Sequence, residues 1–124
     1  MKLKKILRFY FGADSLERAF DNLIKAKALN TESDALETAD MLCSIIGEKI
    51  RLERLWAYID GIILTFSDAE RSVLLKYCVM TPYDYDVRRE TKRVTIKFTR
   101  RAKRLKDFAD DISILNKYYC LIKV

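Results

Sequence analysis

Hydrophobic residues recur every three or four positions along most of the chain, and this spacing predicts helices rather than strands. The first such stretch runs from Leu3 to Phe11, with lysine and arginine between its apolar positions. Gly12 follows directly, and glycine is a common residue just after the end of a helix. The sequence therefore predicts a short amphipathic helix that stops at Gly12.

A second helix is predicted after this glycine. Asp14 is followed three residues later by Glu17, which is the spacing of an N-terminal capping pair. The apolar positions from Leu16 to Ile24 then form one stripe at helical spacing. We expect this helix to begin at Asp14 and to end near Asn30.

The longest periodic segment runs from Ser33 to Leu64 and predicts one long helix that forms the spine of the fold. Gly47 and Gly61 lie inside it, and each costs about 1 kcal/mol relative to alanine, so a kink or break at either is an open alternative. A helix of this length can pack against several shorter helices or against a second copy of itself. Its expected buried stripe is Leu36, Ala39, Leu42, Ile46, Ile50, Leu52, Trp56, Ile59 and Ile63.

A further helix start is predicted at the tetrapeptide 67–70. Ser67 and Glu70 have the spacing of a capping box, in which each side chain binds the backbone amide of the other residue. The helix that follows is expected to run through Cys78 and to end at Thr81, because the residue before a proline disfavours helical geometry. Thr81 and Pro82 also suit the start of the next helix.

The segment after Pro82 allows two interpretations. Val94, Ile96 and Phe98 alternate with polar residues, which is a strand pattern. Over a wider window the apolar residues fall on one helical face, and we prefer a helix over residues 84–108 because a lone strand has no evident partner except the tail 118–124. That tail is expected to be a terminal helical turn or a docked extended segment. The helical face comprises Val87, Val94, Phe98, Ala102, Leu105, Ala109 and Ile112.

Length and composition agree with one helical domain. The chain has 124 residues, half of them hydrophobic, which suits one core and argues against disorder. With 3 glycines and 1 proline, the turns needed for a sandwich or barrel of short strands are scarce. We expect an all-α fold over residues 1–124, a helical bundle with one long central helix and a basic C-terminal helix.

Charge is distributed very unevenly. Residues 1–80 hold 12 basic and 12 acidic side chains, so the formal net charge of +6 comes entirely from residues 81–124. Between residues 88 and 106, ten basic residues accompany a single acid, Glu90. Such a run repels itself unless anions lie nearby. The ten residues are Arg88, Arg89, Lys92, Arg93, Lys97, Arg100, Arg101, Lys103, Arg104 and Lys106.

These ten residues form the candidate nucleic-acid-binding site. If the segment is helical, Arg89, Arg93, Lys97, Arg100 and Arg104 align as a basic ridge about 22 Å long, beside the apolar stripe. Arginine can make forked contacts to phosphates or guanine edges. Polyanion binding is therefore the favoured interpretation. A solvated face, an internal salt-bridge network or an acidic protein partner are the alternatives.

Two segments carry a resemblance to a known family. Residues 67–77 (SDAERSVLLKY) resemble the opening of the helix-turn-helix in sigma-70 region 4 and related phage transcription regulators, and Arg100–Leu105 is similar to the basic end of its recognition helix. The resemblance implies a helical DNA-binding domain whose last helix enters the major groove. The sequence departs from that pattern at Pro82, where the family has a glycine-containing turn.

Few catalytic chemistries remain open to this composition. There is no histidine, which removes the commonest general base and metal ligand, and no glycine-rich phosphate loop is present. Asp107, Asp110 and Asp111 are the tightest acid cluster outside the capping positions, and pairing with nearby lysine and arginine is their simplest role. We expect no enzyme activity, no cofactor, no metal and no small-molecule substrate.

Location and partners complete the expectations. The three cysteines have no metal or redox spacing and suit a reducing cytoplasm, where each is expected to be a buried apolar residue. No stretch is apolar and long enough to cross a membrane. The sequence thus predicts a cytoplasmic, regulatory nucleic-acid-binding protein, with DNA as the favoured target, of a kind found in phages or mobile elements. The alternative is a non-catalytic interaction module, either a homodimer through the long helix or an inhibitor of an acidic or nucleic-acid-handling partner.

Overall fold

The computed structural model describes residues 3–29, 34–79 and 85–124, and of residues 85–87 the backbone alone. Within these ranges the chain forms α-helices and short 3-10 turns and no strand, which confirms the predicted all-α class. The elements are α1 (Leu3–Phe11), α2 (Ala13–Ala28), α3 (Ala35–Ile63), α4 (Asp68–Val79), α5 (Tyr85–Arg101), η1 (Lys103–Phe108), α6 (Ala109–Tyr118) and η2 (Tyr119–Leu121).

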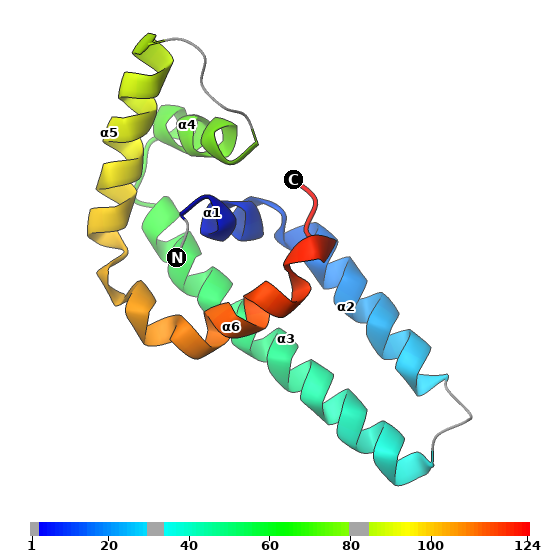
Figure 1. Ribbon diagram of the computed structural model, residues 1–124. Coiled ribbons are helices and arrows are strands. Elements are labelled where there is room, and N and C mark those ends of the chain that lie inside the picture. Colours follow the sequence, from blue (N-terminus) through cyan, green and yellow to red (C-terminus); the bar gives the residue numbers. More distant parts are fainter. Residues whose placement is uncertain (1–2, 30–33, 80–84) are drawn as a thin grey trace.

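The helices are arranged around α1 and the C-terminal half of α3 (Figure 1). Helix α1 packs against α4, α3 and α2, while α5 packs on α4 at the outer edge of the molecule. Helix α6 crosses α3. The N-terminal half of α3 extends away from this body beside α2 as a projecting arm.

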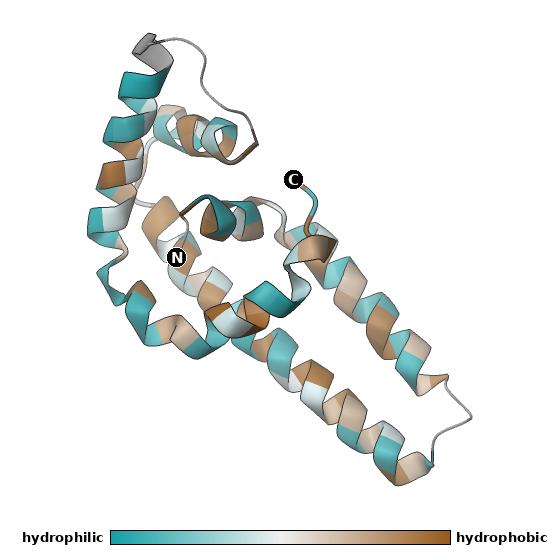
Figure 2. Ribbon diagram, in the orientation of Figure 1, coloured by the Kyte–Doolittle hydropathy of each residue, from teal (hydrophilic) through white to brown (hydrophobic). Residues whose placement is uncertain are grey.

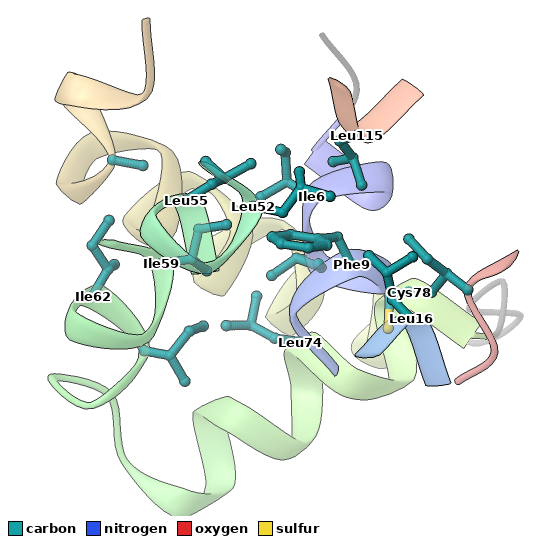
Figure 3. Packing of buried hydrophobic residues seen from close by; sticks show 14 of the residues in the cluster. Ile6, Phe9, Leu16, Leu52, Leu55, Ile59, Ile62, Leu74, Cys78 and Leu115 are labelled. Atoms are coloured by element: carbon teal, nitrogen blue, oxygen red, sulfur yellow. The ribbon is translucent and has the colours of Figure 1, made fainter. Parts of the chain in front are cut away.

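The core is formed where these helices meet (Figure 3). Ile6 and Leu7 of α1 are fully buried, as are Leu55 and Ile59 of α3. Burying one such side chain contributes about 1.5–3 kcal/mol. Other helices contribute Leu74, Val94, Phe98 and Leu115, each also fully buried.

The junction between α1 and α2 is tighter than the sequence indicates. Helix α1 ends at Phe11 as predicted, but α2 begins at Ala13, and Gly12 occupies its N-cap without a side-chain cap. The predicted capping role of Asp14 is therefore wrong, because Asp14 lies inside the first turn. The C-terminal tail occupies this junction instead: the hydroxyl of Ser15 donates to Gly12 O (2.7 Å) and accepts from Lys123 N (2.8 Å).

Helix α3 confirms the predicted long central helix. It is continuous from Ala35 to Ile63, through both glycines, and Asp34 caps it by accepting a 2.7 Å hydrogen bond from Glu37 N. The predicted buried stripe is only partly right. Leu52, Ile59 and Ile63 are buried, and Leu42 and Trp56 are partly buried. However, the arm leaves Leu36, Ala39, Ile46 and Ile50 exposed, since α3 is apolar on more than one face and its neighbours α2 and α6 cover the opposite side.

The predicted capping box is present. Ser67 N donates to Glu70 Oε1 at 3.0 Å, and Glu70 N donates to Ser67 Oγ at 3.2 Å. Helix α4 continues to Val79, and the expectations for Thr81 and Pro82 lie outside the described residues.

Helix α5 confirms the helical interpretation of residues 93–99 but is shorter than predicted. It ends at Arg101, and the chain turns at Ala102 into η1 and then α6. The predicted single helix over 84–108 is wrong at its C-terminal end because tertiary contacts hold the turn. Ala102 is buried, the backbone N–H of Arg104 donates to the Tyr58 hydroxyl (3.0 Å), and the Tyr58 ring stacks on Phe108.

The tail combines both predicted forms. Residues Tyr119–Leu121 make one 3-10 turn, and the backbone becomes extended at Ile122, whose side chain is buried. The cysteine expectation holds for Cys78, whose burial raises the pKa of its thiol, but Cys43 and Cys120 are exposed. Both lie on solvent-exposed sides of helical turns, so the expectation is wrong for them.

Candidate nucleic-acid interface

Helix α5 carries the candidate interface at the edge of the molecule (Figure 1). Its inner side packs on the body through Val94 and Phe98, which are fully buried, and through Thr91. Figure 2 shows hydrophilic segments alternating with hydrophobic ones along this helix. The buried residues recur every three to four positions, so the side opposite to them must face solvent.

The outward side of α5 holds four basic residues and one apolar one. We call Arg89, Lys92, Arg93, Ile96 and Arg100 the outer face; all five are exposed, Ile96 to 40%. From the first to the last, this face extends about 17 Å at 1.5 Å per residue. The ridge predicted from the sequence therefore exists in part, over Arg89, Arg93 and Arg100.

A shallow groove runs along part of this face. It is lined by Arg93, Ile96, Lys97, Arg100 and Arg101, four basic side chains around one apolar residue. Several guanidinium groups around one depression suit the oxygens of a phosphate chain. These five residues are spaced three, one, three and one positions apart, which places them on one side of a helix, and three of them belong to the predicted ridge.

Lys97 has a second role that lies within the fold. Its ammonium donates a 2.7 Å hydrogen bond to Glu70 Oε2, so it joins α5 to α4. Arg93 lies 3.8 Å from the same carboxylate and 3.9 Å from Glu90. The hydrogen bond from Lys97, together with the backbone amide of Ser67, lowers the pKa of the Glu70 carboxyl to about 2.

Arg101 also binds within the fold. Its guanidinium donates to the backbone oxygen of Thr65 (3.2 Å) and to the Thr65 hydroxyl (2.7 Å), and lies 4.9 Å from the centre of the Phe66 ring. One face of this side chain is thus held by the α3–α4 connection. Lys97 and Arg101 consequently anchor α5, while the outer face beside them stays open.

Three of the remaining basic residues lie on η1 and not on the predicted C-terminal helix. Lys103, Arg104 and Lys106 are exposed on η1, beyond the turn at Ala102. Arg104 lies 3.5 Å from Asp107, so one charge of this group is paired. The predicted extension of the ridge to Arg104 is therefore wrong. Arg88 is exposed near the start of α5 and completes the ten predicted residues.

The three aspartates that followed the basic run do not converge. Asp107 pairs with Arg104, as expected, whereas Asp111 is buried and lies 3.8 Å from Arg51 of α3. Asp110 is exposed in the first turn of α6. Within residues 3–29, 34–79 and 85–124, no group of three or more Cys, Asp or Glu side chains is placed to hold a metal ion.

Two contributors to this site were not predicted from the sequence. Ile96 was assigned to a strand alternation, but in the helix it lies at the centre of the outer face. Glu70 was assigned to the capping box alone, and its second oxygen binds a lysine 27 residues away. A helical projection of residues 88–101 would have placed Ile96, whereas no local pattern reveals the Glu70 contact.

Comparisons with known proteins give no relative: no protein-family model, curated protein or solved structure matches the chain. None of the helices in the described ranges has the length and apolar character needed to span a bilayer.

Proposed function

We propose that this protein binds nucleic acid through the outer face of α5, with the phosphate backbone as the main contact. The observation that carries the proposal is the spacing of Arg89, Arg93 and Arg100 along one exposed helical face. Lysine and arginine that neutralise phosphates release condensed counterions, which is the dominant source of affinity for such polyanions.

The pairing of charges supports a ligand for this face. On the flank toward α4, Glu70 offsets Lys97 and part of the charge of Arg93. On the outer face, in the part of the chain that the structure describes, no acid lies within ion-pair distance of Arg89, Lys92 or Arg100. Glu70 and Glu90 therefore offset Lys97 and Arg93, whereas within the described residues the charges of Arg89, Lys92 and Arg100 have no acid beside them, and an external polyanion would supply that compensation.

Duplex DNA is the proposed form of the ligand. The resemblance to the helix-turn-helix of sigma-70 region 4 implies a scaffold helix followed by a recognition helix, and α4 and α5 stand in that order and pack together. The match at Arg100–Leu105 is not the end of one helix, because α5 ends at Arg101 and Lys103–Leu105 lie on η1. Arginines at the outer face can bind phosphates or reach guanine edges in the major groove. A regulatory role in transcription would follow from such binding.

The proposal is tested by titrating labelled duplex DNA and single-stranded RNA with the protein at two salt concentrations. We expect binding to the duplex that weakens steeply with salt, because four contacts from the outer face give a slope near −3.6 in log affinity against log salt. Tighter binding to the RNA than to the duplex would still support an interface on α5, but it would make RNA and not DNA the ligand. No binding to either at low salt would overturn the proposal.

A further inference from the structure

The projecting arm of α3 carries a second apolar face. Leu36, Ala39, Cys43, Ile46 and Ile50 are all exposed, with Leu36 at 74%, Ile46 at 43% and Ile50 at 52%. They follow one another at steps of three, four, three and four residues. This is the spacing of the a and d positions of a coiled coil. We call these five residues the arm seam.

The arm seam lies on the side of α3 that turns away from the protein body. The packed side is marked by Ile45 and Leu52, which are buried, and by contacts to the two neighbouring helices. Lys49 reaches Asp21 of α2 at 3.4 Å, and Glu48 binds Lys117 of α6 at 3.1 Å. At 100° per residue, the seam is centred nearly opposite this packed side. Figure 2 shows hydrophobic segments between hydrophilic ones along the arm.

The seam has the extent of a short coiled-coil interface. From Leu36 to Ile50 it covers about 21 Å of helix. It ends where Glu53, at the next d position, introduces a charge. Three of its five residues, Leu36, Ile46 and Ile50, are large exposed aliphatic side chains, and such a stripe on a monomer indicates an interaction surface.

We infer that this seam binds the same seam of a second copy of the chain, with the two α3 helices antiparallel. In the antiparallel register that sets Ala39 opposite Ile50 of the second copy, Cys43 lies opposite Ile46, and Leu36 lies opposite Glu53 at either end. The four layers made by Ala39, Cys43, Ile46 and Ile50 each pair a small side chain with a large one, which is how facing helices fill the space between them. The face is thus complementary to itself, as a two-fold dimer requires.

The charges beside the seam favour the antiparallel orientation. Asp40 and Arg54 are exposed on the same flank, toward opposite ends of the seam. In an antiparallel pair of this register, Arg54 of one copy lies about 7.5 Å along the helix from Asp40 of the other, so opposite charges attract each other at both ends. In a parallel pair, Arg54 of one copy would lie beside Lys49 of the other, which also pairs with Asp21 of its own α2, and the two like charges repel.

The dimer is independent of the proposed nucleic-acid binding. The seam is on the arm of α3, and the basic outer face is on α5. Figure 1 shows the arm and α5 on opposite sides of the molecule. Association would leave the outer face open, and loss of either activity would leave the other testable.

Sedimentation equilibrium over a wide range of protein concentrations tests the inference. We expect reversible association to twice the monomer mass, weak because the seam is short. Ile46→Glu places a charge in the middle of the seam and should abolish association without unfolding the chain, since Ile46 is exposed. Leu75→Glu on α4 is the matched control, because Leu75 is 39% exposed and lies away from the seam, and it should associate like the wild type.

A charge exchange tests the orientation. Arg54→Asp and Asp40→Arg should each weaken association, and the two changes together should restore it. Strengthening by Arg54→Asp alone would overturn the antiparallel arrangement, since that change removes the repulsion expected in a parallel pair. A wild-type protein that stays monomeric at every concentration, or association unaffected by Ile46→Glu, would overturn the inference as a whole.

Discussion

The carboxylate of Glu70 and the ammonium of Lys97 form a 2.7 Å hydrogen-bonded ion pair that joins α4 to α5. The other carboxylate oxygen of Glu70 accepts from the backbone N–H of Ser67. A single side chain therefore caps one helix and fixes the position of the next. The orientation of the basic outer face depends on this contact.

The Glu70 contact predicts how stability varies with pH. The pKa of Glu70 is about 2 in the folded protein and 4.5 ordinarily, so the folded state binds this proton more weakly than the unfolded state. The contribution of the carboxylate is then fully present above pH 4.5 and is lost as the pH falls toward 2. Glu70→Gln should lower the free energy of unfolding near neutral pH, and its difference from the wild type should shrink across this range.

Urea unfolding at a series of pH values measures this difference. Glu17→Gln, at an exposed position on α2, is the control and should behave like the wild type. A deficit in Glu70→Gln that is the same at every pH would contradict the proposed ion pair.

The Tyr10 side chain makes a second contact that can be tested. Its hydroxyl donates a 2.7 Å hydrogen bond to Asp60, and its ring stacks on Trp56 with centroids 5.3 Å apart. Burial, and then Asp60, raise the pKa of this tyrosine to about 12. Tyr10→Phe keeps the ring and removes the donor, so it should lower the free energy of unfolding by about 1–2 kcal/mol.

The same variant should change the alkaline titration. In the wild type, Tyr10 and Tyr118 should both ionise above the ordinary pKa of 10, Tyr118 because of its burial and its hydrogen bond to Glu48, and only the Tyr10 step should be missing in Tyr10→Phe. Because the folded pKa is raised, the associated stability is present below pH 10 and is lost as the pH rises toward 12. A wild type and variant with the same phenolate absorbance curve in that range would count against the contact.

Gly12 is predicted to be intolerant of any side chain. A Cβ at this position would lie 2.6 Å from the side chain of Ile122 and 2.8 Å from Lys123 O. Gly12→Ala should therefore displace the C-terminal tail and lower the free energy of unfolding by about 1–3 kcal/mol. Gly61→Ala is the control: nothing lies within 4 Å of its added Cβ, and the change should stabilise α3 by up to about 1 kcal/mol. Chemical denaturation measures the free energy of unfolding of both variants. Equal values for the two would refute the close packing of the C-terminal tail on Gly12.

The helices themselves were largely predictable because local signals mark them. The capping box at Ser67 and Glu70 gave the start of α4, and Gly12 gave the end of α1. The turn at Ala102 has no such signal, since neither glycine nor proline precedes it. It is held by Tyr58, whose hydroxyl binds Arg104 N from 46 residues away.

The orientation of α3 could not be predicted for a different reason. Its apolar residues surround the helix, so periodicity alone allows more than one buried side. The sequence was interpreted with Leu36, Ile46 and Ile50 inside, whereas the structure buries Ile45 and Leu55. Which face of α3 is buried depends on the helices that pack against it, among them α2 and α6. For the candidate site, the spacing of the charges predicted the basic helix. It did not predict that Lys97 binds Glu70 and that Arg101 binds Thr65.

The salt dependence of DNA binding tests the central claim most directly. The measurement compares the wild type with Arg89→Ala/Arg100→Ala, which removes two exposed guanidinium groups of the outer face. Arg18→Ala/Lys25→Ala removes two exposed basic side chains from α2 and is the matched control. Loss of two phosphate contacts should reduce the magnitude of the slope by about 1.8 relative to the wild type, and the control should keep the wild-type slope. Equal slopes in all three proteins would contradict an interface on α5.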